Sequence, residues 1–299
     1  MTVIVVGMGR MGKAVAELLR SKYRVVCGDT LDEIKSSIGL WDTVFACVPY
    51  HAVVEVAQYA AEHGANYVDL TEDIGAREQI REIAGRYPMQ LFISGTGLAP
   101  GYINMIAGQL ERRIVHPLSV EMVCGALPQD QYCNPLGYQI SWSPSGLLRE
   151  YTAPCEVKIN GVVEECPALG GFIPEQFPSW PPFETFYTSG GAGTACYTLC
   201  AEDVSYRTLR YLDHLRLIRP LVSGPDPEQR ILDACGELVG EDVVYIFVRV
   251  RSKEGDISYQ ERILPQLGLT AIQYATAMGA IRTWKAALGR TGFVRPEEL

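Results

Sequence analysis

Three glycines near the N-terminus have the spacing of a phosphate-binding turn. Gly7, Gly9 and Gly12 form a G-x-G-x-x-G pattern between the β-branched stretch 2–6 and a helix-periodic stretch, KAVAELL. The first glycine permits a tight turn, the second lets the backbone approach a pyrophosphate, and the third lets the helix pack on the strand. The N–H groups at the helix N-terminus attract phosphate. This context predicts a dinucleotide site that also includes the intervening residues Met8, Arg10 and Met11.

An acidic residue follows this turn at the distance that ribose recognition requires. Asp29 lies at the end of the next predicted strand, seventeen residues after Gly12. A carboxylate at this point accepts hydrogen bonds from the adenosine ribose hydroxyls and repels a 2′-phosphate. The sequence therefore predicts NAD as the cofactor in preference to NADP. Arg10 fits either an ion pair with Asp29 or a contact to phosphate.

Two later turns follow predicted strands of the same sheet. Ligands of open parallel sheets lie beyond the carboxyl ends of the strands, so we expect these turns to approach the nicotinamide half of the cofactor. His51 fits either such a position or an exposed capping position, and residues 71–73 also fit a helix N-cap with acids in the first turn. The cofactor residues predicted in these turns are Val48, Pro49, Asp69, Leu70 and Thr71.

The elements that position these turns alternate between strand and helix. Short β-branched runs are separated by stretches with helical periodicity, a pattern that predicts right-handed βαβ units and a parallel sheet. The predicted fold class is α/β, a Rossmann-type parallel sheet with a second α+β domain inserted before a C-terminal helix. Strands are expected at 2–6, 23–27, 43–48, 66–70 and 90–94, and helices at 51–63 and 73–85.

The pattern changes after about residue 115. Strands are expected at 117–127, 155–163, 243–251 and 258–264, and helices at 203–219 and 268–288. The segment 167–193 is rich in Gly, Pro and aromatic residues, and we expect it to be ordered and to line the site. The predicted domains are a dinucleotide-binding domain (1–115), a substrate and dimerisation domain (116–264) and a C-terminal helix that returns to the first domain (265–299).

Composition excludes several classes of function. The formal net charge of −9 disfavours nucleic acid and anionic lipid as partners. No apolar run reaches the roughly 18–20 residues that span a bilayer, and the N-terminus lacks the basic region of a signal peptide. The nine cysteines include no CxxC pair, and the four histidines have no ligand spacing, so no metal is expected. We expect a reducing, cytoplasmic location, a small-molecule partner, and a homodimer that pairs through strand 243–250 and its neighbour.

Several longer motifs are similar to one known family. The stretches GTGLAPGYINMIAGQL (95–110), CGALPQDQYCNPLGYQISWSPSGLLREY (124–151), FETFYTSGGAGT (183–194), TLRYLDH (208–214) and the terminal GFVRPEEL resemble the saccharopine dehydrogenase-like family. NPLGY with SWSP is the most specific part. The resemblance implies a Rossmann lobe, a central α+β lobe and a last helix returning to the Rossmann lobe. It also implies hydride transfer between a nicotinamide and the carbon of an amine or imine.

Two features favour the lysine 6-dehydrogenase branch of this family. The turn Leu98-Ala99-Pro100-Gly101 lacks the aspartate that is typical of saccharopine reductases, and Asp29 indicates NAD. The expected reaction is oxidative deamination of L-lysine at the ε-carbon, which gives the semialdehyde or piperideine carboxylate. The alternatives are a saccharopine- or carboxynorspermidine-type reductase that forms a secondary amine, and an NAD-binding sensor without turnover. YLDH (211–214) and GGAGT (190–194) differ from the usual family segments, so the substrate is the open point.

This chemistry requires a base, a carboxylate anchor and a wall that excludes water. A guanidinium grips a carboxylate bidentately, which makes Arg149 the first candidate for the anchor and Arg210 the second. His214 is the first candidate for the base because imidazole titrates near neutral pH, with Glu150 and Asp73 as alternatives. Three aromatic residues are expected to wall the pocket, namely Trp142, Tyr151 and Tyr187.

Overall fold

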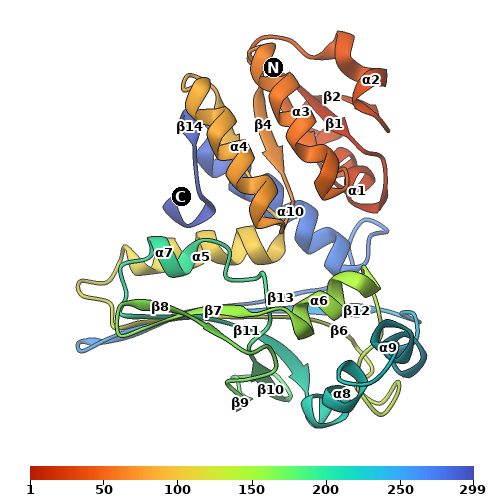
Figure 1. The fold of residues 1–299 in the computed structure, drawn as a ribbon, viewed down its shortest axis with the longest axis vertical. Coiled ribbons are helices and arrows are strands. Elements are labelled where there is room, and N and C mark those ends of the chain that lie inside the picture. The colour runs from red at the N-terminus through yellow and green to blue at the C-terminus, as the bar shows by residue number, and fades with distance from the viewer. The chain divides into compact units, whose positions relative to one another are not determined.

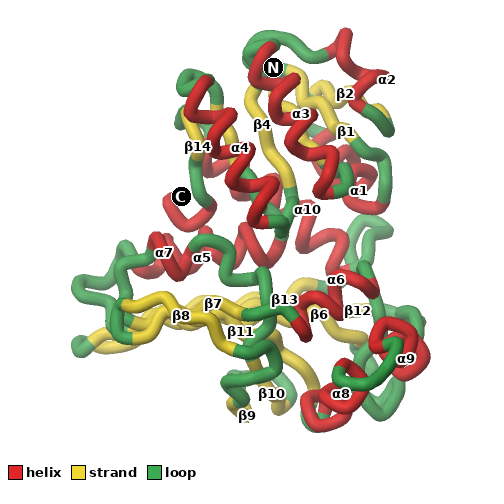
Figure 2. The backbone as a smooth tube through the Cα atoms, viewed as in Figure 1, coloured by secondary structure: helices red, strands yellow, loops and turns green.

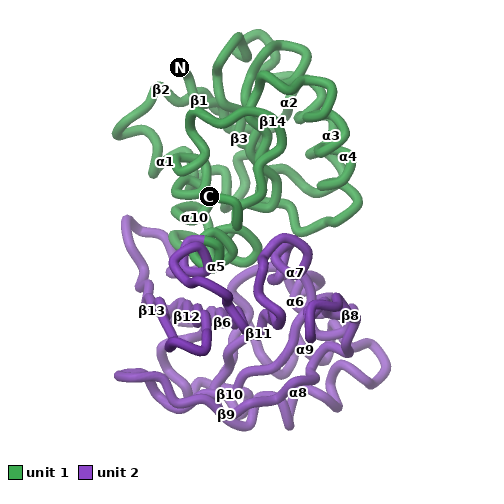
Figure 3. The backbone as a smooth tube through the Cα atoms, turned by 90° about the vertical axis from the view of Figure 1, so that its left-hand side faces the viewer, with its two compact units in different colours: residues 1–108, 273–299 green, residues 109–272 purple.

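The computed structural model describes all of residues 1–299 and divides the chain into two compact units. Unit 1 comprises residues 1–108 and 273–299, and unit 2 comprises residues 109–272 (Figure 3). Both ends of the chain therefore belong to the same unit, and unit 2 is an insertion in its sequence. Each unit has a hydrophobic core of its own. None of the helices is long and apolar enough to cross a membrane.

Unit 1 is a six-stranded sheet in which every strand pair is parallel, in the order β14-β5-β4-β3-β1-β2. The inner strands β1, β3, β4 and β5 are largely buried, because α3 and α4 cover one face of the sheet and α1 and α10 the other (Figure 1). The strands are β1 (Thr2–Val6), β2 (Arg24–Gly28), β3 (Thr43–Ala46), β4 (Asn66–Asp69), β5 (Leu91–Ile93) and β14 (Gly292–Phe293). The helices are α1 (Arg10–Arg20), α2 (Leu31–Ile34), α3 (Tyr50–Glu62), α4 (Ile74–Arg86), α5 (Ile103–Glu111) and α10 (Ala271–Ala287), with short turns η1 (Lys35–Ser37), η2 (Leu98–Tyr102) and η3 (Pro296–Glu298).

The C-terminal helix α10 contributes to the core of unit 1. Trp284 is fully buried, and its ring meets those of Phe45 at 5.4 Å and Tyr23 at 5.2 Å edge to face. The helix approaches the backbone so closely at Gly279 that a Cβ there would lie 2.8 Å from the carbonyl oxygen of Gly97. Burial of a tryptophan from the far end of the chain joins the two sequence segments into one unit.

Unit 2 is a mixed sheet in the order β13-β12-β6-β11-β10-β9 (Figure 2). The pair β6–β11 is parallel, and the other pairs along this order are antiparallel. Helices α6, α8 and α9 pack together at one end of the sheet (Figure 1). The strands are β6 (Ser119–Pro128), β7 (Cys155–Ile159), β8 (Val162–Cys166), β9 (Ile173–Gln176), β10 (Pro182–Phe186), β11 (Asp203–Tyr211), β12 (Asp242–Ser252) and β13 (Gly255–Ile263). The helices are α6 (Pro144–Thr152), α7 (Ala195–Thr198), α8 (His214–Val222) and α9 (Pro227–Cys235).

The predicted fold class, a Rossmann-type parallel sheet with a second α+β domain, is confirmed. The predicted helix at 203–219 is wrong. The chain there forms strand β11, breaks at Asp213 with a φ of 72°, and then begins α8. β11 lies between β6 and β10, so the sheet on both sides determines its conformation, and a helical spacing of apolar residues does not.

Two further expectations concern strands of unit 2. The single strand predicted at 155–163 is a hairpin, because Asn160 and Gly161 both have positive φ (50° and 80°) and form a two-residue turn. Strand 243–250 is the interior strand β12, which is paired with β6 on one side and β13 on the other. Its neighbour β13 is the edge strand at this side of the sheet, so the predicted pairing between two copies would use β13 and stays a prediction.

A buried ionic cluster lies on the sheet of unit 2. The Glu121 carboxylate accepts a hydrogen bond from Arg207 on β11 and another, at 2.5 Å, from Arg249 on β12. The three side chains are only 11–25% exposed, so the charges are largely removed from water. One carboxylate thus pairs directly with two guanidinium groups, and its loss would leave both without a direct ion-pair partner.

We expect Glu121→Gln to lower the free energy of unfolding by about 3–5 kcal/mol, the usual cost of removing one partner from a buried ion pair. Urea denaturation measures this. The matched control is Glu78→Gln, which removes an exposed ion pair with Arg81 and should cost at most about 1 kcal/mol. Equal losses in the two variants would show that the cluster contributes no more than a surface pair.

Candidate functional site

The glycine turn of unit 1 has the geometry that the sequence predicted. Gly7 has a φ of +89°, and its N–H donates to the Gly28 carbonyl at 2.8 Å. A Cβ on Gly7 would lie 2.5 Å from the Cys47 carbonyl oxygen, and a Cβ on Gly12 would lie 1.8 Å from the Gly7 carbonyl oxygen. Only glycine fits either position, because any side chain would overlap backbone atoms.

The N-terminus of α1 is open to a phosphate. Gly9 is the N-cap residue, no side chain caps the helix, and a Cβ on Gly9 would meet no atom within 4 Å. The first N–H groups of a helix need partners from outside the helix, and they favour anions. The residues therefore fit the pyrophosphate of a dinucleotide. Met8 and Met11 are partly buried at this turn, and Arg10 is exposed.

Two carboxylates lie at the end of β2. Asp29 is exposed and accepts a hydrogen bond from the Met8 N–H at 3.0 Å, and Glu33 accepts one from the Asp29 N–H at 2.9 Å. Arg10 forms no ion pair with Asp29, so the predicted contact between these two residues is absent here. Glu33 was not predicted, since it comes from the short helix α2, which sequence periodicity did not indicate.

The turn after β4 is held by the buried side chain of Asp69. Its Oδ1 accepts hydrogen bonds from the Thr71 N–H (2.8 Å), the Ser94 hydroxyl (3.0 Å) and the Gly95 N–H (3.1 Å), which fixes the carboxyl ends of β4 and β5 together. Burial raises the pKa of this carboxyl group. Asp73 accepts from the Ala76 N–H at 2.8 Å and is the N-cap of α4, the capping role that the sequence offered as an alternative.

The remaining cofactor candidates lie at these same strand ends. Val48 and Leu70 are partly buried, and Thr71 is buried with its hydroxyl accepting from the Asp73 N–H at 3.2 Å. Pro49 is the N-cap of α3, and His51 is exposed in its first turn.

In unit 2, the side chain of Arg210 is buried and forms no direct ion pair, although the Glu150 carboxylate acts on it electrostatically. The residue is 3% exposed, and its guanidinium lies 4.5 Å from the centre of the Tyr138 ring. Its Nε donates to the Tyr151 hydroxyl at 2.9 Å, and its Nη1 donates to the Leu209 carbonyl at 2.9 Å. No carboxylate of the chain forms an ion pair with it. A guanidinium in this state favours a carboxylate brought by a ligand.

His214 belongs to the same hydrogen-bonded chain. Its pKa is not near neutral pH, as the prediction of a catalytic base required. It is fully buried, with Nδ1 3.0 Å from the Leu136 carbonyl oxygen and Nε2 3.1 Å from the Tyr151 hydroxyl. Burial, together with the charge of Arg210, lowers its pKa to about 3. The ring is therefore neutral at physiological pH. Because a carbonyl only accepts, Nδ1 carries the proton, and the Tyr151 hydroxyl donates to Nε2 while accepting from Arg210.

The other predicted substrate residues divide between this cluster and other places. Trp142 belongs to it, because its Nε1 donates to the Tyr138 hydroxyl at 3.3 Å. Glu150 is partly buried and acts electrostatically on Arg210 and Tyr151. Arg149 is exposed on α6, so the buried guanidinium of the site is that of Arg210.

Tyr187 and Tyr138 differ from expectation. Tyr187 lies beside the ionic cluster, where its hydroxyl is 3.3 Å from Arg207 Nη2 and its ring lies 5.0 Å from that guanidinium. Side chains alternate between the faces of a strand, so Arg207 and Arg210, three residues apart, lie on opposite faces of β11. Tyr187 therefore does not line the site of Arg210. Tyr138 is completely buried against Arg210 and was not predicted as a site residue, although it is the tyrosine of the NPLGY motif.

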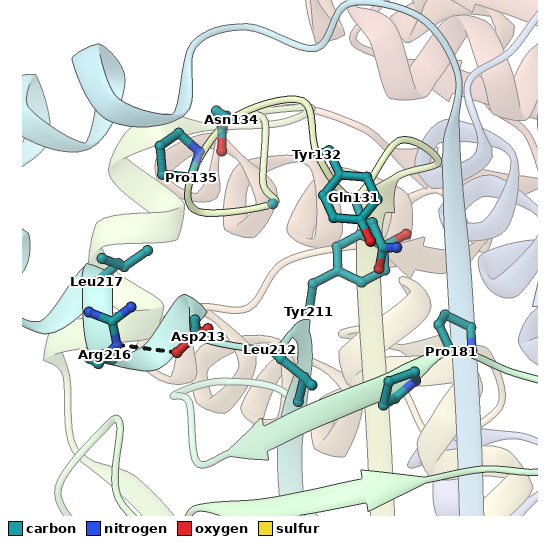
Figure 4. A pocket seen from close by; sticks show the side chains of 12 residues that line it. Gln131, Tyr132, Asn134, Pro135, Pro181, Tyr211, Leu212, Asp213, Arg216 and Leu217 are labelled. Carbon is teal, nitrogen blue, oxygen red and sulfur yellow. Dashed lines mark hydrogen bonds and ion pairs between the residues drawn. The ribbon is translucent and has the colours of Figure 1, made fainter.

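Unit 2 also contains a pocket of about 930 Å³ that is separate from this cluster (Figure 4). It is lined by Tyr132, Pro181, Pro182 and Tyr211, with the Arg216–Asp213 ion pair at one side. None of the predicted site residues lines it. Tyr211 and Arg210 are neighbours in β11, so their side chains point to opposite faces of the sheet.

The lowered pKa of His214 predicts a change in stability with pH. Unfolding restores the ordinary pKa of about 6.5, so the unfolded chain binds a proton that the folded chain refuses. The contribution is fully present above about pH 6.5 and is lost as the pH falls toward 3. Between pH 6.5 and 5, the free energy of unfolding should fall more steeply in the wild type than in His214→Gln, by at most about 1.4 kcal/mol per pH unit. Parallel pH profiles from urea titrations would contradict the neutral buried imidazole.

Comparison with known proteins gives matches over part of the chain in sequence and over the whole chain in structure. Residues 97–232 match the family model of the saccharopine dehydrogenase C-terminal domain. Mitochondrial alpha-aminoadipic semialdehyde synthase of Rattus norvegicus is 27% identical over 144 residues, which is 46% of this chain and 15% of that protein. The Bos taurus protein is 29% identical over 183 residues, 56% of this chain and 19% of that protein. The matching stretches thus span less than a fifth of these relatives.

Two solved structures share the fold. Saccharopine dehydrogenase (L-Glu forming) from Saccharomyces cerevisiae superposes with a TM-score of 0.75 at 14% identity, covering 99% of this chain and 94% of that one. Homospermidine synthase from Legionella pneumophila, in complex with NAD, gives 0.73 at 13% identity, covering 100% and 86%. The family match is thus limited to the domain at residues 97–232, and the two structures show that the fold is shared over the whole chain.

Proposed function

We propose that the protein is an NAD-dependent oxidoreductase that acts on a carbon–nitrogen bond of an amino acid whose carboxylate is held by Arg210. The observation that carries this proposal is the burial of that guanidinium with no carboxylate in direct ion-pair contact. An unpaired buried charge is costly, and the cost is offset when a ligand supplies the opposite charge. The family support and the dinucleotide turn of unit 1 agree with this class of reaction.

Unit 1 supplies the cofactor residues. The N-terminus of α1 at Gly9 holds the pyrophosphate, and Asp29 accepts hydrogen bonds from the adenosine ribose. Glu33 adds a second negative charge at the same strand end, which disfavours the 2′-phosphate of NADP. When bound, NAD supplies the acceptor for the hydride that leaves the substrate carbon.

Unit 2 supplies the substrate residues. Arg210 is fixed from several sides, because Tyr151 and the Leu209 carbonyl accept its N–H groups and Tyr138 lies against its plane. His214 acts through Tyr151 as a positioning residue, since its neutral Nε2 holds the tyrosine hydroxyl in the orientation that accepts from Arg210. A guanidinium held in this way loses little freedom when it binds a carboxylate.

The proton on the substrate nitrogen needs an acceptor before the carbon can be oxidised. Glu150 is our candidate, because its carboxylate acts electrostatically on both Arg210 and Tyr151. His214 is a poor base with its pKa near 3. A carboxylate also attracts the ammonium form of the substrate amine, so one group both binds the nitrogen and accepts its proton.

L-Lysine is the first candidate substrate, oxidised at the ε-carbon to the semialdehyde or its cyclic piperideine carboxylate. Leu98-Ala99-Pro100-Gly101 and Asp29 support this choice, as the lysine 6-dehydrogenase branch shows the same features. The matching relatives are named alpha-aminoadipic semialdehyde synthase, and this proposal gives a product of the same type.

The second candidate is a reductase that joins an aldehyde and an amino compound into a secondary amine. The structural likeness to saccharopine dehydrogenase and homospermidine synthase favours it. Such a substrate carries a further carboxylate or amine and needs another charged anchor beside Arg210.

The direct test is NADH formation with a panel of amino acids and amines at alkaline pH, with L-lysine first. NAD reduction by L-lysine would support the dehydrogenase. If no free amine reduces NAD, but NADH is consumed with an aldehyde and an amino acid, the result would instead support the secondary-amine reductase. Bound NAD without turnover in either direction would overturn both and leave a cofactor-binding sensor.

We expect Arg210→Met to lower kcat/KM for the amino-acid substrate by about 100-fold or more, since it removes a buried partner of the carboxylate. The matched control is Arg149→Met, an exposed arginine on α6, for which we expect less than about a tenfold loss. Steady-state kinetics with the same amino acid compares them. A larger loss of kcat/KM in Arg149→Met than in Arg210→Met would indicate that Arg149 holds the substrate carboxylate.

We expect Asp29→Ser with Glu33→Gln to narrow the preference for NADH over NADPH by about tenfold or more, because two negative charges near the ribose are removed. Fluorescence titration gives the two Kd values without turnover. Asp32→Asn, in the same short helix but paired with Lys35, is the control and should leave the ratio unchanged. An unchanged ratio in the double variant would contradict the assignment of this strand end to the ribose.

A further inference from the structure

Two cysteines face each other across the β7–β8 hairpin of unit 2. In the antiparallel register Cys155 lies directly opposite Cys166, so both side chains are on the same face of the hairpin. The two-residue turn at Asn160–Gly161 fixes this register, because both residues have the positive φ of a tight hairpin turn. The backbone therefore fixes this pairing, whatever the orientation of the long side chains on the surface.

The pair has the separation that a disulfide needs. Counting from the turn, Ile159 and Val162 form the first hydrogen-bonded pair, and alternation makes Cys155 and Cys166 such a pair as well. Cα atoms in these pairs are about 5.5 Å apart, within the range of about 4.4–6.8 Å found in disulfides. The two thiols are in side-chain hydrogen-bond contact, and both are free.

The two thiols have different surroundings, which gives them different chemical roles. Cys155 is 3% exposed, and burial raises its pKa to about 12. Cys166 is partly exposed, and the Arg207 guanidinium opposes the effect of burial on its pKa. Cys166 is therefore the thiol that a reagent from solution reaches first, and Cys155 is the thiol behind it.

We propose that Cys155 and Cys166 form a redox-modification site that closes a reversible disulfide with a low-molecular-weight disulfide as oxidant. The Cys166 thiolate attacks one sulfur of the oxidant, forms a mixed disulfide and releases one thiol. The Cys155 thiolate then attacks Cys166 Sγ and releases the second thiol. In total, two protein thiols are oxidised, the oxidant is reduced to two thiols, and the two thiol protons pass to the released thiolates.

The bond would cross-link the two segments that lead to different parts of unit 2. Cys155 follows α6, whose Tyr151 contacts Arg210. Cys166 precedes Leu169 and Gly170, which exchange backbone hydrogen bonds with Tyr187 at 2.8 and 2.9 Å. This inference does not rest on the proposed reaction, because the register of the hairpin alone carries it.

The test uses the full chain, equilibrated with oxidised and reduced glutathione at several ratios and then trapped with an alkylating reagent. Cleavage after glutamate releases Cys155 in the peptide 151–156 and Cys166 in the peptide 166–175, so that a disulfide links two short peptides. Mass spectrometry reads both the linked and the alkylated forms. The result for the wild-type protein alone decides whether the disulfide between Cys155 and Cys166 forms. Cys166→Ser should abolish the linked species, and Cys200→Ser, which removes an exposed thiol elsewhere, should retain it.

The expected result is a linked pair 151–156/166–175 that rises with the fraction of oxidised glutathione and disappears on reduction. Recovery of both cysteines as separate alkylated peptides at every ratio would overturn the proposal. So would a mixed disulfide with glutathione on Cys166 that never transfers to Cys155.

Discussion

The buried positive charge of Arg210 is the constraint on which the candidate site depends. A guanidinium removed from water must be satisfied, and here two neutral oxygens and an aromatic face do so without a carboxylate. In the free protein the Glu150 carboxylate acts on this charge electrostatically, and no carboxylate forms a direct ion pair with it. Tyr151 and His214 extend this arrangement, since the tyrosine hydroxyl accepts from the arginine and donates its proton to the neutral imidazole.

The two units meet different physical demands. Unit 1 must bring backbone N–H groups to a phosphate, which requires glycine at Gly7 and Gly12 and an uncapped helix at Gly9. Unit 2 must bury charge, which requires a sheet whose strands fix Arg207 and Arg210 on opposite faces of β11. On one face Glu121 neutralises the arginine charge, and on the other no acid pairs with it. This difference separates a stabilising cluster from a candidate binding site.

The cofactor turn could be predicted from residues close together in the sequence. The substrate residues could not, because they are determined by contacts between residues far apart in the sequence. The glycine spacing and Asp29 lie within the first thirty residues and the strand–helix alternation within the first hundred, so the Rossmann sheet followed from the sequence. β11 was mistaken for a helix because its apolar and arginine positions fit a helical spacing, whereas its neighbours in the sheet decide its conformation. Arg149 and Arg210 have the same chemistry, and only burial, set by contacts across some sixty residues, tells them apart.

The central claim is that a buried guanidinium selects the carboxylate of an amino acid during NAD-dependent oxidation. The most direct measurement compares kcat/KM for L-lysine with that for 1,5-diaminopentane, which has the same amine but no carboxylate. The account predicts a preference for L-lysine of about 100-fold or more, the usual effect of removing one partner from a buried charge pair. Equal kcat/KM values for the two amines would contradict it.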